Sequence, residues 1–73
     1  MKKTINFTIS KDNIYYFAVC TDFPIVTQAK TFEELIPNVK EAVDVYLHDE
    51  DSEKIGVVKD PSLLINFEIS AYA

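Results

Sequence analysis

The feature that most constrains the fold is one helical stripe of apolar residues between segments that alternate with period two. Thr31 and Glu34 have the spacing of a capping box, in which the Thr hydroxyl accepts from the Glu34 amide and the carboxylate reaches back. Pro37 follows inside the stripe, and because proline removes a backbone hydrogen bond we expect a kink or a separate first turn there. Apolar residues at steps of three and four predict a helix that lies on a sheet; they are Phe32, Leu35, Ile36, Val39, Ala42, Val43, Tyr46 and Leu47.

Three strands are predicted before the helix. Residues 4–10 alternate polar with β-branched or aromatic side chains, which is typical of a strand with one buried face. Residues 14–20 are apolar throughout, which predicts a strand covered on both faces or central in its sheet, and residues 25–29 form a shorter strand. The turns at 11–13 and 21–24 are short, so the three strands should form an antiparallel meander.

The segment after the helix predicts one further strand. Residues 49–53 read as a solvated acidic loop, 55–58 as a short stretch that pairs weakly, and 60–62 as a turn. Residues 63–72 alternate again, with their apolar face toward the helix. The fold class is therefore α+β with the order β-β-β-α-β. A right-handed crossover makes the last strand parallel to the first, which predicts the sheet order 3-2-1-4 with the helix on one face.

Length and charge limit the classes of function. A chain of 73 residues has room for one domain, residues 1–73. Seven Lys, no Arg and twelve acidic residues give a net charge of −5, which argues against direct nucleic-acid binding and favours a basic protein partner. No apolar run approaches a membrane span, and the alternating start does not form a signal peptide. With a single cysteine the chain has no internal disulfide, so a cytoplasmic location is expected.

No residue constellation predicts catalysis or a cofactor. Cys20 has no nearby histidine and is expected to be a small buried apolar residue. His48 and the acids that follow it are expected to form a solvated helix end, although a metal site at this point is the alternative. Two-metal phosphoryl chemistry needs several convergent carboxylates, and only Asp22 and Glu68 are candidates. We therefore expect no enzyme, no metal and no cofactor; a small metal-dependent nuclease is the alternative from the enzyme class.

Residues 16–47 resemble the HicB antitoxin family. That family reads aromatic-x-Ala-x-Cys-Pro-Asp/Glu-Leu-Pro-Gly-Cys, then Thr-x-Glu-Glu-Ala and a helix that ends Ala-x-x-x-Tyr-Leu. The matching residues are Tyr16, Ala18, Cys20, Asp22, Pro24, Thr31, Glu33, Glu34, Ala42, Tyr46 and Leu47. The resemblance implies a truncated RNase H-like fold and a type II antitoxin that neutralises a small, basic, mRNA-cleaving toxin of the HicA type. All of these residues are scaffold residues, so the motif carries no chemistry of its own.

The chain departs from the family pattern at three places. Ile25 and Val26 stand where the family has Gly-Cys, which alters the turn, and Pro37 stands where a helix former is usual. Longer HicB proteins commonly append a helix-turn-helix or ribbon-helix-helix domain, and no such segment follows the fourth strand here. The resemblance therefore implies no operator binding by this chain, and we expect no direct contact with nucleic acid.

Two sets of residues are candidates for contacts with other proteins. Acidic residues that could mimic RNA phosphates in a toxin's basic groove are Asp22, Asp49, Glu50, Asp51 and Glu53, with a plain solvated loop as the alternative reading. In the predicted sheet order strands 3 and 4 are open edges, which favours a homo-oligomer, either a dimer or a tetramer. Residues hard to bury within one copy are Ile55, Val57 and Val58. An orphan homo-oligomeric scaffold without a toxin is therefore the alternative function.

Overall fold

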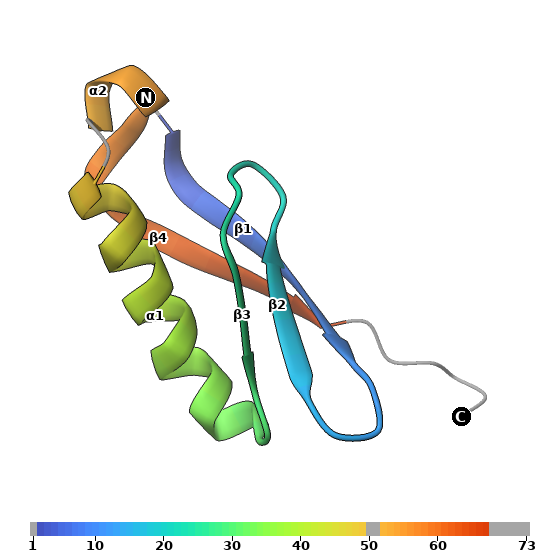
Figure 1. The fold of residues 1–73 in the computed structure, drawn as a ribbon. Helices are drawn as coiled ribbons and strands as arrows, with labels where there is room; N and C mark the ends of the chain where they lie inside the picture. The colour runs from blue at the N-terminus through green and yellow to red at the C-terminus, as the bar shows by residue number, and fades with distance from the viewer. Residues whose placement is uncertain (1, 50–51, 68–73) are drawn as a thin grey trace.

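The computed structural model describes residues 2–49 and 52–67 and shows a mixed sheet with one long helix (Figure 1). The α+β class predicted from the sequence is confirmed. The elements in chain order are β1 (Lys2–Lys11), β2 (Tyr16–Cys20), β3 (Val26–Ala29), α1 (Phe32–Asp49), α2 (Ser52–Ile55) and β4 (Val57–Phe67).

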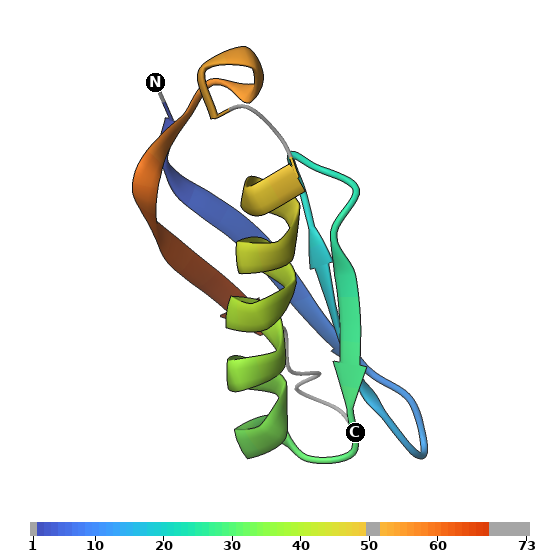
Figure 2. The same cartoon turned by 60° about the vertical axis from the view of Figure 1, so that its left-hand side comes forward.

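The strands form a single sheet in the order β3-β2-β1-β4. The first three strands pair antiparallel as a meander, and β4 pairs parallel with β1, as the helical crossover predicts. Figure 2 shows α1 lying across one face of this sheet, with β3 and β4 at its two edges. The opposite face of the sheet carries no described element.

Strand β1 forms the centre of the core because its apolar residues all point to the helix. Ile5, Phe7 and Ile9 are buried, while the polar residues between them face the open side. Three residues of the α1 stripe are also buried and belong to the same cluster: Leu35, Val39 and Val43. The remaining members of the buried core are Ala18, Cys20, Ile25, Ala29 and Val57.

Helix α1 begins at the predicted residue, with one of the two bonds of the predicted capping box. The Glu34 amide donates to Thr31 Oγ1 at 3.1 Å and the Leu35 amide to the Thr31 carbonyl at 3.2 Å, so Thr31 is the N-cap. The helix continues through Pro37 to Asp49 as one element, with no separate first turn. Pro37 is exposed, so its ring points away from the sheet. Neither helix in the described part of the chain is long and apolar enough to cross a membrane.

The connection between α1 and the last strand differs from the prediction. A short helix, α2, occupies Ser52–Ile55, where an acidic loop and a weak strand were expected. It ends at Gly56, whose φ of 73° is the left-handed conformation that glycine adopts most readily after a helix. Residues 50 and 51 lie outside the described residues. The polar, acidic composition of this segment favoured a loop. In the structure a helical turn instead connects it to the start of β4.

Strand β4 starts earlier than predicted and absorbs the expected turn at 60–62. Lys2 pairs with Val57 and Thr4 with Ser62, so two steps on β1 oppose five on β4. The extra residues form a bulge, which the sheet accepts because β4 is an edge strand. Pro61 lies in this bulge, where the absence of its amide hydrogen breaks no pairing. The predicted strand residues 68–72 lie outside the described residues.

The prediction that Ile55, Val57 and Val58 are hard to bury within one copy is wrong for Val57. Val57 has 0% of its surface exposed, Ile55 packs against the core and Val58 is half-buried. The turn at Gly56 directs Val57 inward beneath the crossover, and sequence spacing does not show this. Val57 therefore needs no second copy to cover it, whereas an oligomer interface at Ile55 and Val58, and homo-oligomer formation itself, stay predictions.

Aromatic contacts hold both ends of α1 against the sheet. At its start, Phe32 lies 5.9 Å from Tyr16 of β2 and 5.7 Å from Phe67 of β4, measured between ring centroids. At its end, Tyr46 lies 5.4 Å from Phe23 in the β2–β3 loop. Such ring pairs add to the burial of apolar surface. They fix the position of α1 relative to β3.

The buried stripe should carry much of the stability, and two alanine substitutions in α1 test this. Leu35→Ala removes a fully buried side chain and should lower the free energy of unfolding by about 2–5 kcal/mol. Val45→Ala, in the same helix but 57% exposed, should change it by less than about 0.5 kcal/mol. Urea unfolding followed by circular dichroism measures both, and equal losses would contradict the packing described.

The β1–β2 turn depends on one carboxylate. Asp12 Oδ1 accepts hydrogen bonds from the Tyr15 amide at 2.6 Å and the Ile14 amide at 2.7 Å. These bonds stabilise the charged form, so they lower the pKa of Asp12 below its ordinary value of 3.8. A carboxyl whose folded pKa is depressed contributes stability above its unfolded pKa, and this contribution is lost as pH falls through the folded pKa.

We therefore expect the Asp12 carboxyl to titrate below 3.8 when followed by NMR. Asp12→Ala should lower stability at neutral pH, and its difference from the wild type should shrink as pH falls below that value. Asp12→Asn keeps the accepting oxygen without the titration, so it is the control: its stability should lack the pH dependence attributed to this carboxyl. A titration midpoint at or above 3.8 would contradict the turn geometry.

Candidate protein-binding site

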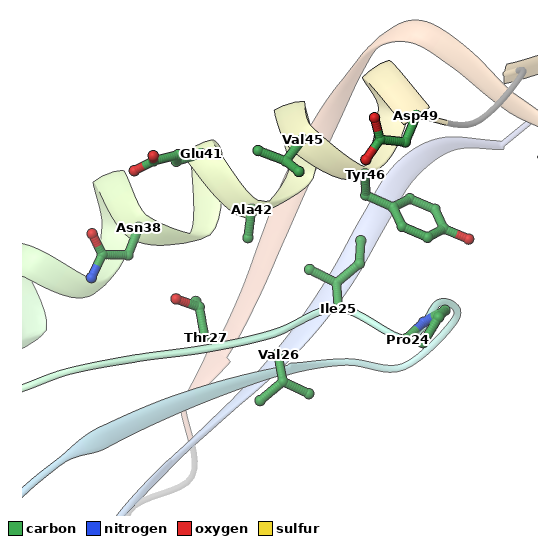
Figure 3. Close-up of a pocket in the computed structure, with 10 residues that line it drawn as sticks. All are labelled: Pro24, Ile25, Val26, Thr27, Asn38, Glu41, Ala42, Val45, Tyr46 and Asp49. Atoms are coloured by element: carbon green, nitrogen blue, oxygen red, sulfur yellow. The ribbon is translucent and has the colours of Figure 1, made fainter.

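A groove of about 500 Å³ lies between β3 and the neighbouring side of α1 (Figure 3). In Figure 3 the Ile25 and Thr27 side chains point toward the helix, and the Val26 side chain points away from it. The described residues that line the groove are Pro24, Ile25, Val26, Thr27, Asn38, Glu41, Ala42, Val45, Tyr46 and Asp49. The groove therefore combines one row of α1 with the edge of a strand.

The backbone of β3 has a paired side and an open side. The Cys20 amide donates to the Ile25 carbonyl at 2.9 Å, so this carbonyl and the polar groups of residues 27 and 29 are directed to β2, while the Ile25 amide donates to the Phe23 carbonyl at 2.8 Å. Val26 and Gln28 alternate with them and direct theirs outward. Asn38 Nδ2 donates to the outward Gln28 carbonyl at 3.1 Å, which confirms this alternation. The Val26 amide, the Val26 carbonyl and the Gln28 amide therefore face the open edge.

The helix side of the groove is acidic with an exposed apolar residue at its middle. Glu41 and Asp49 are both exposed carboxylates, and no Lys is among the described residues that line the groove. Val45 lies between them in sequence and is exposed on the solvent side of α1. The sign of this charge favours a basic partner segment.

The sheet face opposite α1 forms a second candidate surface, which we call the open sheet face. The strand register places uncharged residues side by side across it. They are Thr4, Asn6, Thr8, Ser10, Phe17, Val19, Val26, Gln28, Ser62, Leu64 and Asn66. Val19, Val26 and Leu64 are exposed there. Of the two forms predicted for the apolar strand, β2 is central in its sheet but is not covered on both faces.

The structure describes the side chains of two of the five predicted acidic residues, Asp22 and Asp49, and whether the five act together stays a prediction. Asp22 is exposed in the loop between β2 and β3, and Asp49 is exposed at the end of α1, where it lines the groove. Glu53 belongs to α2. Glu50 and Asp51 lie outside the described residues. Of the two whose side chains the structure describes, Asp49 lines the groove and Asp22 does not.

The candidates for chemistry are placed as follows. Cys20 is buried in the core as a free thiol, which confirms that it acts as a small apolar residue. His48 is exposed near the end of α1. Over residues 2–49 and 52–67 no three His, Cys, Asp or Glu side chains are grouped to hold a metal ion. Glu68, one of the two nuclease candidates, lies outside the described residues.

Sequence reasoning missed the groove residues Val26, Asn38 and Val45. Asn38 and Val45 both lie outside the apolar stripe of the helix. Of these two, Val45 could have been noticed in the sequence, because it is an apolar residue on the side expected to face solvent. Val26 could have been noticed for a similar reason, because it is apolar and its neighbour Ile25 takes the buried face of the strand. Neither residue by itself predicts a groove, because the groove forms only where α1 approaches β3.

The fold and the groove define a small α+β protein with one open strand edge beside an acidic helix. The chain is 35% identical over 68 residues to a UPF0150 protein of Helicobacter pylori strain J99, covering 90% of this chain and 94% of that protein. The chain belongs to the UPF0150 family. No protein-family model matches it, and no solved structure matches it significantly.

The bond from Asn38 to β3 can be tested directly. Asn38→Ala removes the donor to the Gln28 carbonyl and should lower the free energy of unfolding by about 0.5–1.5 kcal/mol. Gln28→Ala leaves that carbonyl and its bond in place, so its effect should stay within about 0.5 kcal/mol. Urea unfolding compares the two variants, and a larger loss for Gln28→Ala would show that the bond does not hold β3 to α1.

Proposed function

We propose that this protein is a HicB-like antitoxin that binds and neutralises a small, basic, mRNA-cleaving toxin of the HicA type. The observation that carries the proposal is the acidic groove beside an open strand edge, which suits a basic polypeptide. The net charge of −5 acts in the same direction, because it attracts a basic protein and repels nucleic acid. Such a role is one of binding, and it needs no catalytic residue and no cofactor.

The motif shared with HicB proteins supports the proposal through the scaffold. Ala18 and Cys20 pack under α1, while Thr31 caps it. Tyr46 meets Phe23 at the far end of the helix. The motif residues therefore position α1 against β3 and so form the groove. Apart from the short helix α2 before β4, the element order is the β-β-β-α-β order of the truncated RNase H-like fold that the resemblance implies, although fold alone does not establish function.

Charge should determine how this protein inhibits its partner. A toxin that cleaves mRNA must attract phosphates with a basic surface, and carboxylates on an inhibitor compete for that surface. Glu41 and Asp49 present two such carboxylates on one side of α1. Asp22 is a further exposed acidic residue, in the loop that leads into β3.

Co-expression tests the proposal. A small basic protein encoded next to this chain should arrest growth when expressed alone, and growth should return when this chain is co-expressed. Mixing the two purified proteins should give one complex on gel filtration. If this chain fails to rescue growth from that neighbour, the antitoxin proposal is wrong. Metal-dependent RNA cleavage by this chain alone, abolished by Asp22→Asn, would favour the nuclease alternative instead.

Charge reversal locates the contact with the toxin. The double variant Glu41→Lys, Asp49→Lys should weaken the complex at least about tenfold, because both groove carboxylates become cations. Glu33→Lys, Asp60→Lys changes the net charge equally but alters exposed residues outside the groove, and should weaken it far less. Calorimetry measures both, with circular dichroism as the check on folding. Equal losses would show that only overall charge matters.

A second candidate function, a homo-oligomeric scaffold, is favoured by one observation. The open sheet face is uncharged and exposes Val19, Val26 and Leu64, so the net charge does not oppose contact between copies at this surface. Light scattering at micromolar concentration should then give a dimer or larger mass, and Val19→Lys should reduce it to a monomer. A monomer mass for the wild type would contradict this candidate.

A further inference from the structure

We propose that the β3 edge accepts an extended basic segment of a partner protein as a fifth strand of the sheet, with alternate side chains of that segment in the acidic groove. This inference deepens the proposed function and rests on it for the identity of the partner. The mode of recognition rests on the backbone groups and side chains of β3 and α1.

The first support is the state of the strand edge. Val26 directs both its amide and its carbonyl outward, and Gln28 adds its amide, while Asn38 already occupies the Gln28 carbonyl. An added antiparallel strand forms two hydrogen bonds with one residue of the edge, one to its amide and one to its carbonyl. It forms the next bonds with the edge residue two positions away. Val26 is therefore the residue that pairs fully. Addition of a strand to an exposed edge is a recurring way in which proteins bind extended peptides.

The second support is the spacing of side chains on α1. Glu41, Val45 and Asp49 follow one another at steps of four along the helix, so Glu41 and Asp49 are separated by about 12 Å along the helix axis. Alternate side chains of a strand repeat every ~6.7 Å, so residues i and i+4 lie ~13 Å apart on one face. A strand with basic residues at i and i+4 and an apolar residue at i+2 therefore matches the row of carboxylate, valine and carboxylate.

The third support is the direction of α1. A two-residue connection joins β3 to α1, and Figures 1 and 2 show the helix running back alongside the strand. The helix row and the strand edge therefore extend together. The side chains at i+1 and i+3 of the added strand fall on the other face of the sheet, next to Val26, whose side chain points away from α1 (Figure 3).

The charge of the groove favours a foreign strand over a second copy. If β3 of another copy paired at this edge, two α1 helices would come side by side on the same face of a joined sheet. The Glu41 and Asp49 rows of both copies would then face one another, and like charges placed together are destabilising. A basic segment reverses the sign of this interaction.

A short peptide provides the probe. The capped peptide Lys-Thr-Val-Thr-Lys has the required pattern, and Glu-Thr-Val-Thr-Glu is the matched control of opposite charge. NMR titration should shift the Val26 and Gln28 amides with the basic peptide and leave them unchanged with the acidic one. Amide exchange at Val26 should slow in the complex. Shifts confined to Thr8, Val19 and Leu64, which lie on the open sheet face away from the β3 edge, or equal shifts with both peptides, would overturn the proposal.

Val26→Pro tests strand addition against the toxin. The Val26 amide points outward and makes no bond to β2, so proline at this edge position removes only the outward donor. The affinity for the basic partner should fall about tenfold or more, whereas Val26→Ala, which keeps the amide, should retain it. If Val26→Pro proves unfolded by circular dichroism, the peptide titration decides. Equal affinities of the two variants would overturn the proposal.

The outcomes separate this inference from the antitoxin proposal. If the toxin binds and Val26→Pro binds it equally well, the strand edge is not the site, and the antitoxin function stands. If the basic peptide binds at Val26 but the neighbouring basic protein does not, the site stands and the antitoxin function fails. A dimer of this chain that Val26→Pro dissociates would mean that a second copy occupies the edge, which overturns the inference.

Discussion

The packing of one helix on the central strand is the interaction on which the rest of the structure depends. Leu35, Val39 and Val43 meet Ile5, Phe7 and Ile9 in a core from which water is excluded. A chain of 73 residues has little other apolar surface to bury, so the helix cannot leave this position without loss of the fold. Aromatic contacts at both ends hold α1 in line, and its distance from β3 follows from them.

A single helix on a four-stranded sheet leaves surfaces uncovered. The open sheet face keeps uncharged residues in contact with solvent, and β3 keeps an edge with three outward polar groups of the backbone. The other edge strand, β4, carries a bulge and Pro61, features that hinder further pairing. The two edges therefore differ: one is protected and the other is open beside an acidic helix, as a binding surface requires.

Charge and backbone geometry act together in the function proposed here. The acidic groove selects the sign of a partner, and the strand edge selects an extended conformation. Neither property needs a catalytic residue. The residues that match the HicB pattern contribute indirectly, because they position α1 and β3 so that the acidic side chains and the open strand edge lie in one groove. This accounts for a resemblance that consists of core and capping residues.

The sequence by itself determined the elements whose periodicity was clear: the strand at 4–10, the helix after Thr31 and the α+β class. It also determined the sign of the surface charge and the burial of Cys20. Only the tertiary structure decided the early start of β4, the inward position of Val57 and the groove itself. Periodicity reports which face of one element is apolar. It does not report how closely two elements approach, and the side chains of Asn38, Glu41 and Val45 meet the β3 edge only after the core has brought α1 and β3 together.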